Sequence, residues 1–293
     1  MANKAQQVTV NSFRDSQGNF SMLAVDQRES LRNMLGRASP GRPIADSELV
    51  NFKVQACEAL TPYASGVLVD RLYGLPAARV AKCPLILAAD VLHSDVAGGP
   101  VTRAEVDHEV TAAVVDEFGA TALKMLVAWL PDARGEATGL AQEFMDLCRR
   151  LEIVGIVEGV VRPADFDTWC DADKNDALVQ AAQDLATSKP DLYKAEVPLF
   201  GAGTTTDIIT TAQRITDSVD CPWVVLSSGV DANAFPRAVE LSMAGGASGF
   251  LAGRAVWADA TSSADSGDFL RSQSAARLQQ LADGLPNHNS DVR

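Results

Sequence analysis

Short aliphatic runs alternate with longer amphipathic segments along most of the chain. Eight of the aliphatic runs have the length of a β-strand and contain few polar positions, which is typical of strands buried on both faces of a parallel sheet. The predicted strands are Met22–Val25, Gly66–Asp70, Leu85–Ala89, Ala122–Val127, Ile153–Val157, Leu192–Glu196, Trp223–Leu226 and Gly249–Ala252.

The segments between these runs carry apolar residues at helical spacing. The predicted helices are Asp46–Leu60, Thr102–Phe118, Leu140–Arg150, Lys174–Thr187, Thr206–Ser218 and Phe235–Ala244. Thr102 and Glu105 have the spacing of a capping box at the start of one helix. Gly245 and Gly246 are placed to end another helix.

Eight strands alternating with helices predict a single α/β domain of the (β/α)8 TIM-barrel type. We expect the barrel to occupy residues 1–285 and a polar C-terminal tail to occupy residues 286–293. No G-x-G-x-x-G motif opens a helix after the first strand, which argues against a dinucleotide-binding fold. The Asp-rich segment Pro163–Asp173 is predicted to form a loop over the barrel mouth.

Composition narrows the function classes. No apolar run approaches the roughly 18 residues of a membrane span, and the N-terminus lacks the hydrophobic core of a signal peptide. The five cysteines are scattered without a C-x-x-C pair, which indicates reduced thiols in a cytoplasmic protein. The three histidines have no metal-ligand spacing, so we expect neither a metal nor another cofactor.

The net charge of −13 disfavours a nucleic-acid or anionic-membrane partner. A small anionic substrate would need a local positive pocket inside this acidic shell. Basic residues next to apolar strands therefore become the candidates for such a pocket.

Polar or charged residues accompany all eight predicted strands. They are Asp26-Gln27-Arg28, Asp70-Arg71, Asp90, Lys124, Glu158, Lys194, Ser227-Ser228-Gly229 and Gly253-Arg254. In a barrel the carboxyl ends of the strands face one shared mouth, where active sites lie. One polar strand end is ordinary, but a polar group at every strand predicts an active site.

Two lysines stand within otherwise aliphatic strands. Lys124 and Lys194 could simply snorkel to water, or form structural pairs with Glu158 or Glu196. Chemistry offers a second interpretation, because a neutral amine attacks a carbonyl to form a Schiff base, and burial or a nearby cation favours the neutral amine. A carboxylic acid can then shuttle protons during dehydration and C–C cleavage. Two lysines and Glu158 on three successive strands favour this Schiff-base chemistry.

The turns after the seventh and eighth strands predict a phosphate site. In α/β barrels these loops often bind phosphate through backbone N–H groups and a helix N-terminus. Gly229 and Gly253 would let the backbone approach an anion closely, and Arg254 could add a bidentate contact. Two ordinary glycine turns remain the alternative.

Several stretches resemble the class I tagatose-bisphosphate aldolase family, from about residue 20 to residue 260. They are Leu23–Arg28, Leu60–Ser65, Asp191–Pro198, Leu226–Val230 and Leu251–Trp257. Within this family the chain is most similar to the sulfofructose-phosphate aldolases, through Ala88–Asp90, Val160–Pro163, Ser227–Asp231 and Phe235–Val239. Two features depart from that pattern: Asp70–Pro76 is partly of the tagatose type, and Gly159 stands where a proline is expected.

The resemblance implies a class I aldolase that cleaves 6-deoxy-6-sulfofructose 1-phosphate to dihydroxyacetone phosphate and 3-sulfolactaldehyde. This reaction belongs to sulfoglycolysis, a route of sulfoquinovose degradation. The resemblance also implies a homo-oligomer.

Residue roles follow from the same resemblance. It implies that Lys194 forms the Schiff base, Glu158 shuttles protons, and Lys124 and Asp26 hold substrate hydroxyls and tune the lysine. Ser227, Gly229, Gly253 and Arg254 would bind the C1 phosphate, and Gln27 and Arg28 would face the far end of the ketose. We further hypothesise that Arg28 contacts the C6 sulfonate.

Two alternatives stay open. The first is a tagatose-1,6-bisphosphate or fructose-1,6-bisphosphate aldolase with the same lysine chemistry. A sulfonate carries one charge where a phosphate carries about 1.5 to 2, so the scarcity of spare basic residues at the strand ends favours the sulfonate. The second is a phosphosugar isomerase or a non-catalytic phosphosugar-binding barrel, because one fold hosts many functions.

Overall fold

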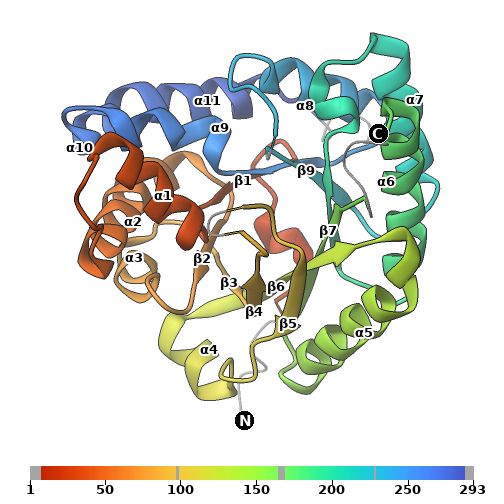
Figure 1. The fold of residues 1–293 in the computed structure, drawn as a ribbon, viewed down its shortest axis with the longest axis horizontal. Coiled ribbons are helices and arrows are strands. Elements are labelled where there is room, and N and C mark those ends of the chain that lie inside the picture. The colour runs from red at the N-terminus through yellow and green to blue at the C-terminus, as the bar shows by residue number, and fades with distance from the viewer. Residues whose placement is uncertain (1–7, 97–98, 164–168, 228, 288–293) are drawn as a thin grey trace.

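Eight parallel strands close into a barrel with helices around it (Figure 1). The computed structural model describes residues 8–96, 99–163, 169–227 and 229–287. The barrel strands are β1 (Phe20–Ala24), β2 (Val67–Asp70), β3 (Leu85–Ala88), β6 (Ala120–Trp129), β7 (Val154–Val161), β8 (Leu192–Glu196), β9 (Trp223–Leu226) and β10 (Gly249–Ala252). The predicted (β/α)8 class is confirmed, and each predicted strand is present with its ends shifted by at most a few residues.

Strand order around the barrel follows chain order, and β10 closes the ring against β1 through Phe20 and Gly249. Strands β6 and β7 are longer than the sequence pattern predicts. Glu158, predicted to follow its strand, therefore lies within β7, and Lys124 lies within β6 as predicted.

The helices pack around the outside of the barrel. They are α1 (Glu29–Ala38), α2 (Asp46–Leu60), α3 (Leu75–Val80), α4 (Ala112–Phe118), α5 (Arg134–Arg150), α6 (Asp171–Ala186), α7 (Thr205–Thr216), α8 (Phe235–Ala244), α9 (Arg254–Trp257), α10 (Ser266–Phe269) and α11 (Ala275–Asp283). Shorter helical turns are η1 (Val10–Phe13), η2 (Thr61–Tyr63), η3 (Pro131–Ala133), η4 (Pro198–Gly201), η5 (Ala258–Ser262) and η6 (Leu270–Ser274). None of the helices in the described ranges is long and apolar enough to cross a membrane.

The prediction of one helix over Thr102–Phe118 is wrong in its first half. Residues Arg103–Val106 form strand β5, which pairs antiparallel with β4 (Asp90–His93) in a small sheet of its own. The side chains of β5 alternate between exposed and buried, which is the period of a strand. Pairing with β4 therefore overrides the capping-box spacing of Thr102 and Glu105.

The Asp-rich loop prediction is met only in part. Asp171 already belongs to the first turn of α6, so the loop ends earlier than expected. Residues 164–168 of that segment lie outside the described residues, as do residues 288–293 of the predicted tail.

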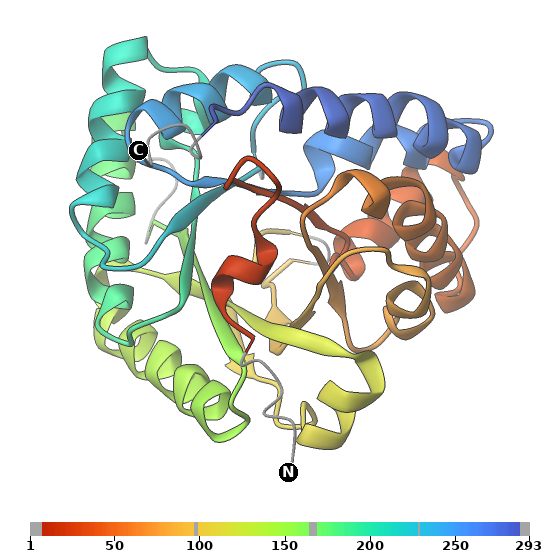
Figure 2. The same cartoon turned by 180° about the vertical axis from the view of Figure 1, so that it is seen from behind.

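Apolar residues form separate layers inside and outside the sheet. The inner layer contains the side chains of Met22, Ile86, Ile156 and Leu192. Phe13 of η1 belongs to this layer as well. Figure 2 shows the turn η1, in red, lying across one end of the barrel. This turn leaves the opposite end of the barrel as the accessible mouth.

A third apolar cluster lies nearer the mouth. Leu126, Val160 and Leu226 contribute from three barrel strands. Leu92 of the β4–β5 hairpin and Val101 pack against them. The hairpin side chains therefore cover part of the mouth, above the layer that holds the two lysines.

Candidate active site

Strand alternation turns the two lysines and Glu158 into the barrel. Leu192, Ile156 and Ala122 belong to the inner apolar layer, and residues two positions further along each strand share that face. Lys194, Glu158 and Lys124 therefore point inward as well. Residue pairing in the sheet sets Glu158 directly beside Lys194.

Glu158 lies between the two lysine amines. Its Oε2 is 2.6 Å from Lys124 Nζ and 3.0 Å from Lys194 Nζ. All three side chains are almost completely buried. A carboxyl group at this distance from an amine can exchange protons with it, as imine chemistry requires.

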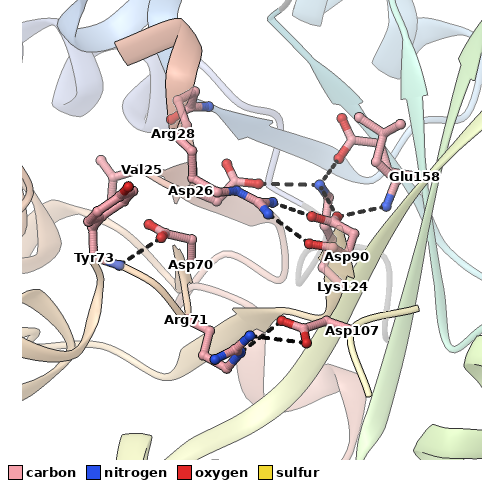
Figure 3. Close-up of polar contacts among 12 residues, drawn as sticks. Val25, Asp26, Arg28, Asp70, Arg71, Tyr73, Asp90, Asp107, Lys124 and Glu158 are labelled. Atoms are coloured by element: carbon pink, nitrogen blue, oxygen red, sulfur yellow. Dashed lines mark hydrogen bonds and ion pairs between the residues drawn. The ribbon is translucent and has the colours of Figure 1, made fainter. Parts of the chain in front are cut away.

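Lys124 is also surrounded by two further carboxylates (Figure 3). Its Nζ lies 3.2 Å from Asp26 Oδ2 and 3.2 Å from Asp90 Oδ2. Burial acts to lower the pKa of Lys124, but the charges of Asp90, Glu158 and Asp26 outweigh it and raise the pKa. Lys124 is therefore held as an ammonium ion, which cannot act as a nucleophile.

The carboxylates respond in the opposite direction. Burial acts to raise the pKa of Asp26, but Lys124, Lys194 and Arg28 lower it to about 2. The pKa of Asp90 is lowered as well, because Lys124 and Arg28 outweigh its burial. Both groups are charged at neutral pH. Lys194 contacts one carboxylate, Glu158, among the described residues, so it is the better candidate nucleophile.

Asp90 is a member of the site that has no predicted role in the sequence analysis. The Asp90 carboxylate binds Arg28, and Arg28 Nη1 also donates to the Asp90 carbonyl at 2.7 Å. The same carboxylate accepts a hydrogen bond from the Leu126 N–H at 3.0 Å. The guanidinium of Arg28 thus already has an anionic partner. Contact between Arg28 and a substrate sulfonate stays a prediction, but this pairing does not favour it.

A second buried ion pair fixes the end of β1. Lys53 Nζ lies 2.6 Å from Asp70 Oδ1 and donates to the carbonyls of Val25 and Gln27. The side-chain oxygen of Gln27 is buried and accepts no hydrogen bond from the described residues. Gln27 therefore offers an acceptor for a substrate hydroxyl. The sequence signal for Lys53 is its position among the apolar, buried residues of α2.

The residues expected to bind the C1 phosphate lie together where β9 and β10 end. Ser227 Oγ accepts hydrogen bonds from the N–H groups of Gly253 at 3.2 Å and Ala255 at 3.5 Å. A Cβ on Gly253 would lie 2.6 Å from the Ala24 carbonyl oxygen, and Gly229 has φ +78°, so both positions favour glycine. Ser228 lies outside the described residues.

Arg254 is half-buried and within electrostatic reach of the Glu158 and Asp26 carboxylates. Burial lowers its pKa, while Glu158 and Asp26 act to raise it. Helix α9, which begins at Arg254, has only four residues. The helix N-terminus expected at this site is therefore short, and Ser227, Gly253 and Arg254 carry the anion-binding potential.

No group of three or more His, Cys, Asp and Glu side chains in the described residues is arranged to hold a metal ion. The polar groups of the mouth instead form a lysine–carboxylate network. Such a network suits imine formation, proton transfer and anion binding.

The sequence also did not identify a second polar cluster at the mouth, formed by Arg162, Lys174 and Glu196. Glu196 accepts the Val161 N–H at 2.8 Å, and its Oε1 lies 4.0 Å from Lys174 Nζ. Glu196 shares the inward face of β8 with Lys194. That shared face is the one sequence signal that could have placed it in the site.

Known proteins with related sequences are aldolases. The chain is 30% identical over 271 residues to a tagatose 1,6-diphosphate aldolase of Listeria monocytogenes, which covers 84% of this chain and 79% of that protein. It is 30% identical over 287 residues to the tagatose 1,6-diphosphate aldolase of Staphylococcus haemolyticus, covering 88% of this chain and 87% of that protein.

A solved structure shares the fold. A Schiff base-forming fructose-1,6-bisphosphate aldolase superposes with a TM-score of 0.64 at 14% identity, covering 92% of this chain and 96% of that one. The model of the DeoC/LacD family aldolases matches residues 20–259, which span all eight barrel strands. The chain is therefore a carbon–carbon lyase that belongs to the DeoC/LacD family of aldolases.

Proposed function

We propose that the enzyme cleaves a ketose 1-phosphate through a Schiff base on Lys194. The observation that carries this proposal is the position of Glu158, whose Oε2 lies 3.0 Å from Lys194 Nζ. Lys124, held as an ammonium ion by three carboxylates, occupies the other side of Glu158.

The proposed reaction begins with transfer of a proton from the Lys194 ammonium to Glu158, 3.0 Å away. The neutral Lys194 amine then attacks the C2 carbonyl. Glu158 donates a proton to the carbinolamine hydroxyl, which leaves as water and gives the iminium ion. Glu158 then accepts the C4 hydroxyl proton as the C3–C4 bond breaks and the aldehyde leaves. The bonding electron pair moves into the iminium to form an enamine. Protonation at C3 and hydrolysis of the imine release dihydroxyacetone phosphate and regenerate Lys194.

The other residues bind the substrate in this proposal. Ser227, Gly229, Gly253 and Arg254 hold the C1 phosphate. Lys124, Asp26 and Gln27 face the hydroxyl groups of the open chain. Because these charges are in place before the substrate arrives, they need not reorganise during the reaction.

For the far end of the substrate we propose a sulfonate, which makes the substrate 6-deoxy-6-sulfofructose 1-phosphate. The ion pairs of two arginines near the mouth support this choice. Arg28 and Arg71 near the mouth are already paired with Asp90 and Asp107, and a sulfonate needs fewer cations than a phosphate. The second candidate is tagatose or fructose 1,6-bisphosphate, which the names of the relatives favour.

Release of dihydroxyacetone phosphate from the three substrates in parallel tests the proposal. We expect the highest kcat/KM with 6-deoxy-6-sulfofructose 1-phosphate. A higher kcat/KM with a bisphosphate would replace the sulfonate by the second candidate. Absence of triose release from all three would remove the aldolase proposal and favour an isomerase or a binding protein.

The proposal also places the enzyme in the cytoplasm as a homo-oligomer. All five cysteines are free thiols, as a reducing compartment would keep them. Sedimentation equilibrium tests the oligomer, and a single species at the mass of one chain would contradict it.

A further inference from the structure

Glu196, Lys174 and Arg162 form a polar cluster above Lys194. Glu196 lies two residues beyond Lys194 on the same face of β8, which sets it roughly 7 Å nearer the mouth. The Val161 N–H donates to Glu196 Oε2 at 2.8 Å. Lys174, in the first turn of α6, lies 4.0 Å from the other carboxylate oxygen and stacks over the Phe200 ring.

Arg162 differs from Arg28 and Arg71, which both pair with carboxylates. Its Nη1 donates to the Val161 carbonyl and its Nε donates to the Val101 carbonyl, both at 2.8 Å. No carboxylate of the described residues lies at ion-pair distance from it, whereas Arg28 is paired with Asp90. Among the described residues, Arg162 is thus a half-buried cation whose hydrogen-bond partners are main-chain carbonyls.

The charges of this cluster do not balance. Arg162 and Lys174 share one carboxylate, that of Glu196. The distance of 4.0 Å between Lys174 Nζ and Glu196 Oε1 is long for an ion pair. Burial lowers the pKa of Lys174 to about 8, although Glu196 opposes the change. Burial likewise lowers the pKa of Arg162. Keeping positive charge out of water is costly unless it is paired, so an additional anion would stabilise the cluster.

The chain next to the cluster is strained. Leu199 and Phe200 both have φ of 51°, a conformation that costs a non-glycine residue about 1–3 kcal/mol. This turn holds the Phe200 ring against the Lys174 ammonium. Strain of this kind is concentrated at functional sites, which supports a role for the cluster beyond packing.

We propose that Arg162 and Lys174 form the subsite for the anionic group at the far end of the ketose, and so determine which substrate is accepted. This inference rests on the proposed aldolase function. The C1 phosphate would lie where β9 and β10 end, C2 at Lys194, and the far anion nearer the mouth, against Arg162 and Lys174. Arg162 therefore takes the role that the sequence suggested for Arg28.

The experiment compares a ligand that lacks the far end of the ketose with a ligand that has it. Dihydroxyacetone phosphate has the C1 phosphate alone, and its imine is trapped with borohydride. The full ketose 1-phosphate with a C6 sulfonate or phosphate has both ends, and its cleavage gives KM. The variants are Arg162→Gln, Arg162→Lys and Lys174→Met, with Arg71→Gln as the matched control, because Arg71 is a mouth arginine with a carboxylate partner.

We expect Arg162→Gln to raise the KM of the full ketose about 10- to 100-fold, as loss of a charged hydrogen-bonding partner would. Lys174→Met should raise it less, and Arg162→Lys should recover part of the loss. Trapping of dihydroxyacetone phosphate should change less than twofold in each variant. This trapping also verifies that each variant is folded.

Two results would overturn the inference. One is an unchanged ketose KM in Arg162→Gln with normal trapping, or a larger effect from Arg71→Gln. The other is an equal loss of trapping and of ketose affinity in Arg162→Gln, which would assign Arg162 to the C1 end or to folding. Failure of the unmodified enzyme to trap dihydroxyacetone phosphate would instead refute the proposed function.

Discussion

Replacing Lys124 by Met should destabilise the protein in a pH-dependent manner. Lys124 neutralises Asp26, Asp90 and Glu158 inside the barrel. Removing one partner of a buried ion pair leaves unpaired charge and costs about 3–5 kcal/mol. We therefore expect the free energy of unfolding of Lys124→Met to fall by that amount at pH 7.5.

The sign of the pH effect follows from the carboxylates. With Lys124 present, the pKa of Asp26 is lowered from 3.8 to about 2. This shift stabilises the fold by about 2 kcal/mol above pH 4, and the stabilisation is lost as the pH falls toward 2. Without Lys124, the largest of the charges that oppose burial is gone, so the pKa of Asp26 is higher than it is with Lys124 present. The variant therefore regains stability as protons bind at lower pH, and its deficit should be smaller at pH 5.

Urea unfolding followed by tryptophan fluorescence at pH 7.5 and pH 5 measures this difference. Lys82→Met is the matched control, because Lys82 is exposed and its replacement should change stability by less than about 0.5 kcal/mol. A deficit in Lys124→Met below about 1 kcal/mol, or one that is equal at both pH values, would refute the view that Lys124 neutralises these carboxylates.

Three further predictions concern the catalytic carboxyl, the barrel wall and the C1 site. Glu158→Gln should lower kcat by about 10²- to 10⁴-fold in the cleavage assay, and an unchanged kcat would exclude Glu158 as the proton shuttle. In Gly159→Ala the new Cβ would overlap Tyr193 Oη, so urea unfolding should show a loss of about 1–3 kcal/mol. Adding Tyr193→Phe should restore part of this loss, and equal stability of the single and the double variant would contradict the contact. Ser227→Ala removes the acceptor of the Gly253 N–H and should raise the KM of the ketose about 2- to 10-fold, whereas an unchanged KM would place the C1 phosphate elsewhere.

The barrel and its central residues could be predicted because burial on both faces of a strand is visible in sequence. The aliphatic runs around Lys124 and Lys194 identified both the strands and the unusual lysines. The contact of both with Glu158 then follows from strand order and the two-residue alternation.

Long-range partners were harder to predict. Strand β5 depends on β4 across a connection that local spacing does not describe, so residues Arg103–Val106 were assigned to a helix. The pairing of Asp90 with Arg28 joins residues 62 positions apart. The sequence could not show that this pairing occupies Arg28 while leaving Arg162 with main-chain partners.

Mapping the covalent adduct of dihydroxyacetone phosphate tests the central claim most directly. The protein is incubated with this triose phosphate, reduced with borohydride, digested and analysed by mass spectrometry, with Lys194→Met as the control. We predict one reduced adduct, on Lys194, that is absent from the control. An adduct on Lys124 or another lysine, or no adduct at all, would contradict the assignment of Lys194 as the Schiff-base residue.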